Sequence, residues 1–179
     1  VGDLPVEFGS LPNLRVLSLS NNQLTSLPAG LGNMVGLQWV ELDSNQLTSL
    51  PVEIGKLNGL HTLLLSHNHF VGLPAELGNL SNLFYLDLDN NFLKSVPGTL
   101  GNLSRLETLS LDNNQLSSLP PEFGNLVNLE SLSLDSNQLT TLPSEMGNLK
   151  RLYSLSANNN QLVTLPLALA KINIRKLSL

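Results

Sequence analysis

Residues 14–33 read LRVLSLSNNQLTSLPAGLGN, and this arrangement of leucine, asparagine and proline returns every 23 residues along the chain. Seven units begin at Leu14, Leu37, Leu60, Leu83, Leu106, Leu129 and Leu152. With few exceptions, each unit follows L-x-x-L-x-L-x-x-N-x-L, then Leu-Pro or Val-Pro two residues later, and usually Gly-Asn before the next unit. A fixed period of this length predicts a solenoid, in which each unit packs only against its neighbours.

The leucine spacing within a unit predicts a short β-strand. Side chains alternate between the two faces of a strand, so Leu17 and Leu19 of the first unit point to the same, inward side. The residues before, between and after them occupy three outward slots, which we call the first, second and third: Val16, Ser18 and Ser20. One such strand cannot bury its apolar face alone, so we expect the units to stack into a parallel sheet over a continuous leucine core. With strands about 4.8 Å apart, roughly eight of them give a sheet about 35–40 Å long.

An asparagine recurs just after each predicted strand. This asparagine column comprises Asn22, Asn45, Asn68, Asn91, Asn114, Asn137 and Asn160. The chain turns sharply at this point, where its backbone groups cannot pair in the sheet, and a buried amide offers both donors and an acceptor to satisfy them. We therefore expect the column to be architectural and not a ladder for binding a ligand.

Proline and glycine mark the return segments between strands. The prolines are Pro28, Pro51, Pro74, Pro97, Pro120, Pro143 and Pro166. Proline has no N–H to donate, which suits the outer side of the solenoid and the opening of a short helical turn. The glycines are Gly32, Gly55, Gly78, Gly101, Gly124 and Gly147. We expect them to adopt positive φ as the chain bends back to the next strand.

The repeated pattern resembles the leucine-rich repeat family, and the resemblance covers essentially all 179 residues. The 23-residue length and the LPxxLGNL return segment are similar to intracellular Ras-group and scribble-like scaffolds, and to repeats of Roco and many bacterial proteins. The Gly-x-Ile-Pro segment of the plant-receptor variant is absent. The resemblance implies an α/β-type repeat solenoid, a curved horseshoe with a parallel β-sheet on its concave face and irregular or short helical segments on its convex face. It also implies recognition of a protein without catalysis.

The ends of the chain fall inside repeats. We interpret residues 1–179 as a single domain: a partial repeat at 1–13, seven repeats from 14 to 173, and a partial repeat at 174–179. Neither end carries an obvious polar cap, which a solenoid needs to stay soluble. We therefore expect a fragment of a longer protein. An alternative is that the uncapped ends associate with another chain.

Composition narrows the classes of function. The net charge is −5, there is no cysteine, and neither a membrane-spanning run nor a signal peptide is present. The absence of cysteine argues against disulfide-stapled extracellular caps, which favours a cytoplasmic location. Asn79-Leu80-Ser81 and Asn102-Leu103-Ser104 match the glycosylation pattern, although the recurring Gly-Asn-Leu segment explains both without secretion. No phosphate loop, zinc-ligand spacing or nucleophile motif appears, so we expect no catalytic residue, metal or cofactor.

Acidic side chains gather in the outward slots. Those that we predict to contact a partner are Glu41, Asp43, Asp87, Asp89, Asp112 and Asp135. The strand segments between Gln38 and Ser136 carry no lysine or arginine at all. A concave surface of one sign favours capture of a basic partner and disfavours nucleic acid. The alternative is that the aspartates keep the sheet soluble, because the third slot repeats aspartate as if it were part of the scaffold.

Large apolar side chains occupy outward slots in three consecutive units. Trp39, Leu64 and Tyr85 should be exposed by the alternation that buries the leucines, and Phe84 lies beside them, with Phe92 and His61 at the edge of the patch. Tryptophan and tyrosine in such positions are typical interface anchors. We therefore predict a partner with a basic and apolar surface. The alternative is that these residues pack against one another or against a neighbouring domain.

The three histidines, His61, His67 and His69, all lie in one unit. His61 precedes the strand and the other two follow it, which separates them by about 15–20 Å along an extended chain, so we expect no metal site. A pH-sensitive contact at the patch edge is the alternative. For the whole chain we predict a scaffold that binds a protein on its concave face. Its rivals are a targeting module of a multidomain signalling enzyme, such as a GTPase, kinase or ligase, and a structural element that self-associates through its ends.

Overall fold

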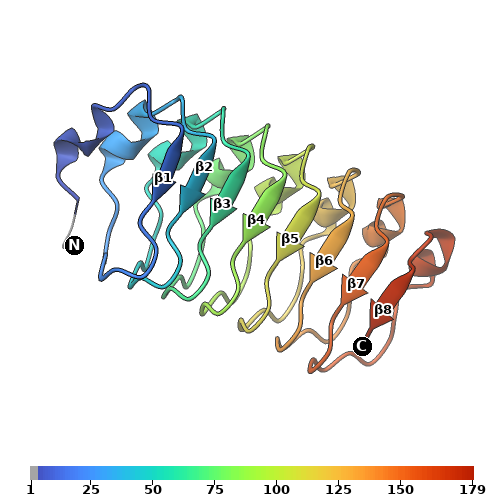
Figure 1. Ribbon diagram of the computed structural model, residues 1–179. Coiled ribbons are helices and arrows are strands. Elements are labelled where there is room, and N and C mark those ends of the chain that lie inside the picture. Colours follow the sequence, from blue (N-terminus) through green and yellow to red (C-terminus); the bar gives the residue numbers. More distant parts are fainter. Residues whose placement is uncertain (1–3) are drawn as a thin grey trace.

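In the computed structural model, residues 4–179 form one open sheet of parallel strands in sequential order, with a helical turn behind each strand (Figure 1). The first three residues of the expected partial repeat 1–13 lie outside the described part of the chain. The strands are β1 (Val16–Ser18), β2 (Trp39–Glu41), β3 (Thr62–Leu64), β4 (Tyr85–Asp87), β5 (Thr108–Ser110), β6 (Ser131–Ser133), β7 (Ser154–Ser156) and β8 (Lys176–Ser178). The predicted α/β-type solenoid with a curved parallel sheet is confirmed.

The outer segments are single turns of 3₁₀ helix. They are η1 (Val6–Gly9), η2 (Ala29–Asn33), η3 (Val52–Lys56), η4 (Ala75–Asn79), η5 (Gly98–Asn102), η6 (Pro121–Asn125), η7 (Ser144–Asn148) and η8 (Leu167–Lys171). A proline stands immediately before each turn, as Pro74 does before η4 with φ −67°. The prolines therefore open the helical turns, as the sequence indicated. Within residues 4–179, no helix has the length and apolar character needed to cross a membrane.

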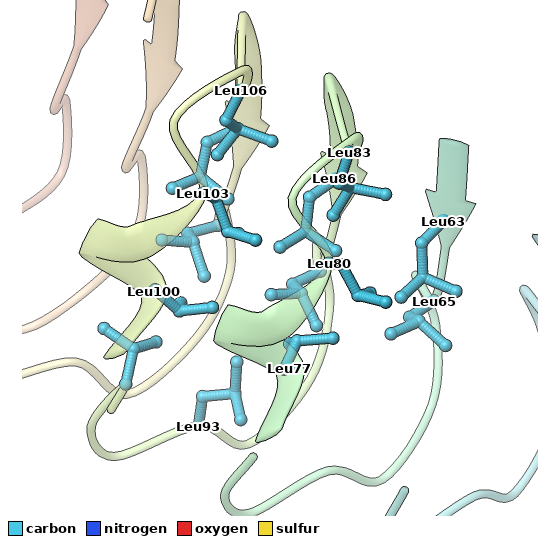
Figure 2. Close-up of a cluster of buried hydrophobic side chains, with 14 of the residues drawn as sticks. Leu63, Leu65, Leu77, Leu80, Leu83, Leu86, Leu93, Leu100, Leu103 and Leu106 are labelled. Carbon is cyan, nitrogen blue, oxygen red and sulfur yellow. The ribbon is translucent and has the colours of Figure 1, made fainter. Parts of the chain in front are cut away.

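Leucines from the strands and from the outer turns meet in one continuous core. Leu63 and Leu65 of the third repeat, Leu86 of β4 and Leu77 of η4 are fully buried. Figure 2 shows such side chains filling the space between the sheet and the outer turns of neighbouring repeats. Each of β1–β7 carries a buried residue between two outward ones, except that the first slot of β3 is also buried, whereas the middle residue of β8, Leu177, is 48% exposed. The predicted inward residues are thus confirmed for β1–β7.

The asparagine column joins each repeat to the one before it. The Nδ2 group of Asn91 donates to the carbonyl oxygens of Leu88 and Asp89 in its own repeat and of Leu65 in the preceding repeat, each at 3.1 Å. Its Oδ1 accepts the backbone N–H of Phe70 at 3.1 Å. Five members of the column are buried: Asn45, Asn68, Asn91, Asn114 and Asn137. These contacts explain why the strand can end abruptly without leaving buried backbone groups unpaired.

The expected role of the glycines is wrong. Among residues 4–179 no glycine has positive φ; the left-handed positions are Asn21, Ser44, His67, Asn90, Asn113, Ser136 and Asn159, with φ between 54° and 58°. Each precedes an asparagine of the column, and asparagine and histidine tolerate this conformation better than most residues. The glycines instead allow close packing of the outer turns. A Cβ atom on Gly78 would lie 2.2 Å from the carbonyl oxygen of Thr99 in the next turn.

Candidate functional site

The predicted apolar anchors lie together on β2, β3 and β4. The sheet register aligns Trp39 with Thr62 and Thr62 with Tyr85, so the two aromatic residues face each other across one strand. An open hollow of about 370 Å³ lies here, which we call the recognition hollow; it is lined by Trp39, Thr62, Leu64, Phe84, Tyr85 and Asp87. Trp39 and Phe84 are each 40% exposed, whereas Leu64 and Tyr85 are half-buried. The structure therefore brings the predicted cluster together but leaves only part of it fully open to solvent.

The indole of Trp39 is held in place by a carboxylate. Its Nε1 donates a 2.8 Å hydrogen bond to Oε1 of Glu41, and the Ser18 hydroxyl donates to the other carboxylate oxygen. These bonds from Ser18 and then Trp39 lower the pKa of Glu41 and keep its carboxylate charged. A fixed aromatic wall loses little freedom when a partner binds, which favours affinity.

Thr62 is a member of the site that sequence reasoning missed. It occupies an outward slot, yet it is only 1% exposed, and it lies on the strand between Trp39 and Tyr85. Among the described residues its hydroxyl is the buried side-chain atom that has no hydrogen-bond partner. Its burial could have been inferred from the sequence, because the first slots of three consecutive repeats place the small Thr62 between the aromatic Trp39 and Tyr85. A buried hydroxyl without a partner is costly, so this group calls for an explanation.

Negative charge gathers at one side of the hollow. The Asp87 carboxylate accepts the backbone N–H of Asp89 at 3.0 Å. Burial, followed by the charge of Asp43, raises the pKa of Asp87 against the lowering effect of its hydrogen bonds. Burial, followed by the charges of Asp87, Asp89 and Asp43, raises the pKa of the Tyr85 hydroxyl. The carboxylates therefore create a negative potential that reaches the aromatic side chains.

The third-slot aspartates contact the scaffold directly. Asp89 accepts the backbone N–H of Asp112 at 2.7 Å, and Asp112 accepts that of Asp135 at 2.6 Å. In the same way, Asp43 accepts the backbone N–H of Ser66 at 2.9 Å and Asp135 that of Asn158 at 2.6 Å. Burial is the largest influence on Asp89 and Asp112 and raises the pKa of both. These carboxylates thus satisfy backbone groups where the strands end, and their predicted contact with a partner stays a prediction.

Two histidine–phenylalanine pairs flank the hollow on opposite ends of the strands. His61 stacks on Phe84 with ring centroids 5.4 Å apart, and His69 lies 5.8 Å from Phe92 in a tilted arrangement. His67 takes one of the left-handed positions with φ 54°. Over residues 4–179, no group of three or more histidine, aspartate or glutamate side chains is arranged to hold a metal ion. His61 and His69 therefore extend the rim of the apolar patch through their phenylalanine partners.

Comparisons with known proteins find matches along most of the chain. One family model, described as a leucine-rich repeat region, matches residues 2–115, and a second, described as a leucine rich repeat, matches residues 104–162. None of the curated proteins matches the chain.

Three solved structures illustrate the similarity. A leucine-rich-repeat protein of Leptospira interrogans is 38% identical with a TM-score of 0.83, over 99% of this chain and 51% of that one. An internalin of Listeria monocytogenes is 26% identical with a TM-score of 0.82, over 97% and 50%. The ectodomain of the receptor kinase GASSHO1/SCHENGEN3 from Arabidopsis thaliana, in complex with Casparian strip integrity factor 2, is 40% identical with a TM-score of 0.80, over 89% and 20%. The present chain thus spans about half or less of the length of these proteins. With its repeat pattern, its sheet and these matches in agreement, the chain belongs to the leucine-rich repeat family.

Proposed function

We propose that this chain binds a protein partner on its concave sheet, without catalysis, and that the recognition hollow on β2–β4 is the centre of the contact. The observation that carries the proposal is the hollow itself, with Trp39 and Tyr85 on either side of one strand. Aromatic side chains at the centre of an interface contribute most of its binding energy. The similar GASSHO1/SCHENGEN3 ectodomain was solved with a bound partner, which supports recognition as the general role of this fold.

The rest of the sheet is a poorer candidate for the centre. The first and second slots of β5, β6 and β7 hold only threonine and serine, which are small and bury little apolar area. Here the third-slot aspartates, Asp112 and Asp135, extend the contact at its rim. Exposed carboxylates speed the approach of a basic partner but add little energy each, and salt weakens their effect.

Selection from a library of random displayed peptides tests the proposal without knowledge of the natural partner. We expect the bound peptides to lose at least about 30-fold in affinity, or roughly 2 kcal/mol, on Trp39→Ala or Tyr85→Ala. Tyr153→Ala is the matched control, because Tyr153 is an exposed aromatic residue in the seventh repeat, outside the hollow. Peptides that bind all three variants equally well would place recognition elsewhere on the molecule.

Two rivals rest on separate observations. Because the chain spans only 20% of the ectodomain of a similar receptor kinase, it fits a targeting module of a larger signalling enzyme, a role that leaves the concave contact unchanged. Leu177 and Leu179, at and just after β8, are 48% and 53% exposed, which favours self-association through this end. Light scattering over a range of protein concentrations distinguishes them, since only self-association raises the mass with concentration.

The cytoplasmic location stays a prediction, because the similar proteins include extracellular ectodomains. Asn79 and Asn102 of the two glycosylation patterns are exposed on the outer turns. If the full protein were secreted by a cell that glycosylates such sites, both would be accessible for modification. A mass measurement on protein from its source cells that shows no added sugar supports the cytoplasmic assignment.

A further inference from the structure

The strand spacing sets the distance across the recognition hollow. Trp39 and Tyr85 are two strands apart in the sheet, which places their backbones about 10 Å from each other. A cation bound midway between positions at this spacing comes within the range of about 6 Å over which it is attracted to an aromatic face. The hydrogen bond from Trp39 to Glu41 keeps one of the two walls in place.

Among the described residues, the carboxylates at the hollow take part in no salt bridge. Asp87 lines the hollow and Glu41 lies on the neighbouring strand in register with Leu64. The one salt bridge found among residues 4–179 joins Arg151 and Glu130, in another repeat. The hydrogen bond from the Asp89 N–H stabilises the Asp87 carboxylate but leaves its charge without a paired cation.

The floor of the hollow is closed, and its wall carries the polar group. Thr62 lies on the strand between the two aromatic residues and is only 1% exposed, so its unpaired hydroxyl stays inside the scaffold. The polar group that the hollow offers to an occupant is therefore the half-buried Asp87 carboxylate. An occupant with several N–H donors and a flat, weakly hydrated surface can donate to this carboxylate and stack on the aromatic walls, and this combination is found in a guanidinium group.

We propose that the recognition hollow holds one arginine side chain of the partner, with its guanidinium between Trp39 and Tyr85 and its N–H groups directed to Asp87. This inference rests on the proposed function and adds the chemistry of the anchor residue. The surrounding carboxylates of Glu41, Asp43 and Asp89 complement the positive charge. Leu64 and Phe84 contact the aliphatic part of the side chain at the rim.

The fluorescence of Trp39 reports directly on the hollow, because Trp39 is the only tryptophan in the chain. The probes are N-acetyl-arginine amide and N-acetyl-citrulline amide, which have nearly the same shape but differ in charge, at matched ionic strength. We expect a saturable change with the arginine probe and at least about tenfold weaker binding of the citrulline probe. Equal binding of the two probes, or no saturable change with arginine up to about 50 mM, overturns the proposal.

Asp87→Asn tests the charged wall of the hollow. It should weaken binding of the arginine probe about tenfold and leave binding of the citrulline probe unchanged. Glu122→Gln removes one charge from the exposed outer turn η6 and is the control for net charge. Thr62→Val is the control for the scaffold beneath the hollow, since valine has nearly the shape of threonine and removes a buried, unpaired hydroxyl; we expect a higher melting temperature with unchanged binding of the arginine probe. Equal loss of binding in Asp87→Asn and Glu122→Gln would assign the effect to net charge and count against the proposal.

The peptides selected above distinguish failure of this inference from failure of the proposed function. If they need Trp39 and Tyr85 and contain an arginine that cannot be replaced by citrulline, both stand. If they need the two aromatic residues but use an apolar anchor, the arginine assignment is wrong and concave recognition remains. If their binding does not depend on Trp39 or Tyr85, both proposals fail.

Discussion

Repeats 2–4 (residues 37–105) and repeats 5–7 (residues 106–173) are built on the same scaffold but present different outer surfaces. Asn91 in the first region and Asn137 in the second make the same four hydrogen bonds, at 3.1 Å in one and 2.9–3.3 Å in the other. The strand register continues unchanged from β2 to β7. The first and second outward slots differ: in repeats 2–4 they hold aromatic, acidic and apolar residues beside Thr62, and in repeats 5–7 they hold only threonine and serine.

The second slot shows what this difference means physically. In repeats 6 and 7, Ser133 donates to the Asp112 carboxylate at 2.6 Å and Ser156 to the Asp135 carboxylate at 2.7 Å. The polar groups of this region therefore satisfy one another. In repeats 2–4 the same slot holds Glu41, Leu64 and Asp87. None of these is a serine, so the bond from a second-slot hydroxyl to the aspartate of the preceding repeat is lost. The scaffold tolerates the loss, because leucine packing and the asparagine column hold the repeats together without it.

The largest expected effect tests whether the two regions share one scaffold. Asn91→Ala leaves the N–H of Phe70 and three carbonyl oxygens without their partner, as Asn137→Ala does for its own set. We expect each substitution to lower the free energy of unfolding by about 3 kcal/mol. Urea denaturation measures both, with the exposed Gln138→Ala as a control near zero. A clear difference between the two asparagines would break the comparison.

The next effect concerns the outer turns. Gly78→Ala would place a methyl group 2.2 Å from the carbonyl oxygen of Thr99, whereas nothing lies within 4 Å of the Cβ position at Gly72. We expect Gly78→Ala to lower the melting temperature, at a cost of about 2 kcal/mol, although alanine in a helical turn would otherwise stabilise. Gly124→Ala in repeat 5, which would meet the carbonyl oxygen of Glu145 at 2.5 Å, should act in the same direction. Gly72→Ala should change the melting temperature little. A similar loss of melting temperature there would show that glycine is needed for its backbone conformation and not for close packing.

The sequence predicted the scaffold better than the surface. Leucine and asparagine at fixed spacing admit one arrangement, so the sheet, the core and the role of Asn91 followed from the repeat alone. The prediction for the glycines was wrong. Glycine is selected either because it adopts positive φ or because it allows another backbone to approach closely, and the repeat pattern does not distinguish the two. The burial of Thr62 also escaped prediction. It depends on the residues beside Thr62 in the sheet register, Trp39 and Tyr85, and these belong to two other repeats.

A smaller effect is expected when the outer surface of repeat 3 is made like that of repeats 5–7. Leu64→Ser restores a hydroxyl in the second slot, in position to donate to Asp43, and removes a half-buried apolar side chain. The two changes oppose each other, so we expect the free energy of unfolding to change by less than about 1 kcal/mol. The selected peptides should bind more weakly at the same time. A large loss of stability would show that Leu64 belongs to the scaffold.

The smallest effect is a dependence of stability on pH in repeat 4. Because the pKa of Asp87 is raised above 3.8 in the folded state, its charged form disfavours folding, and stability falls as pH rises through this window. Asp87→Asn should therefore be more stable than the parent at pH 7, by less than about 1 kcal/mol after solvent screening. The difference should vanish below pH 3.8. Thermal melts of both proteins, with Glu122→Gln beside them, test the sign.

The bonds that the asparagine column makes between repeats join residues 21 or 26 apart, and the backbone N–H bonds accepted by the third-slot aspartates join residues 23 apart. Each of these bonds between repeats therefore connects a position to the equivalent region of an adjacent unit, whichever unit that is. Removing one whole unit, such as residues 106–128, brings together two surfaces that already carry the complementary groups. Removing fewer residues misaligns all of them at once. Such a chain can be lengthened or shortened by recombination between its own units, so the number of repeats is free to vary while the length of each is held constant.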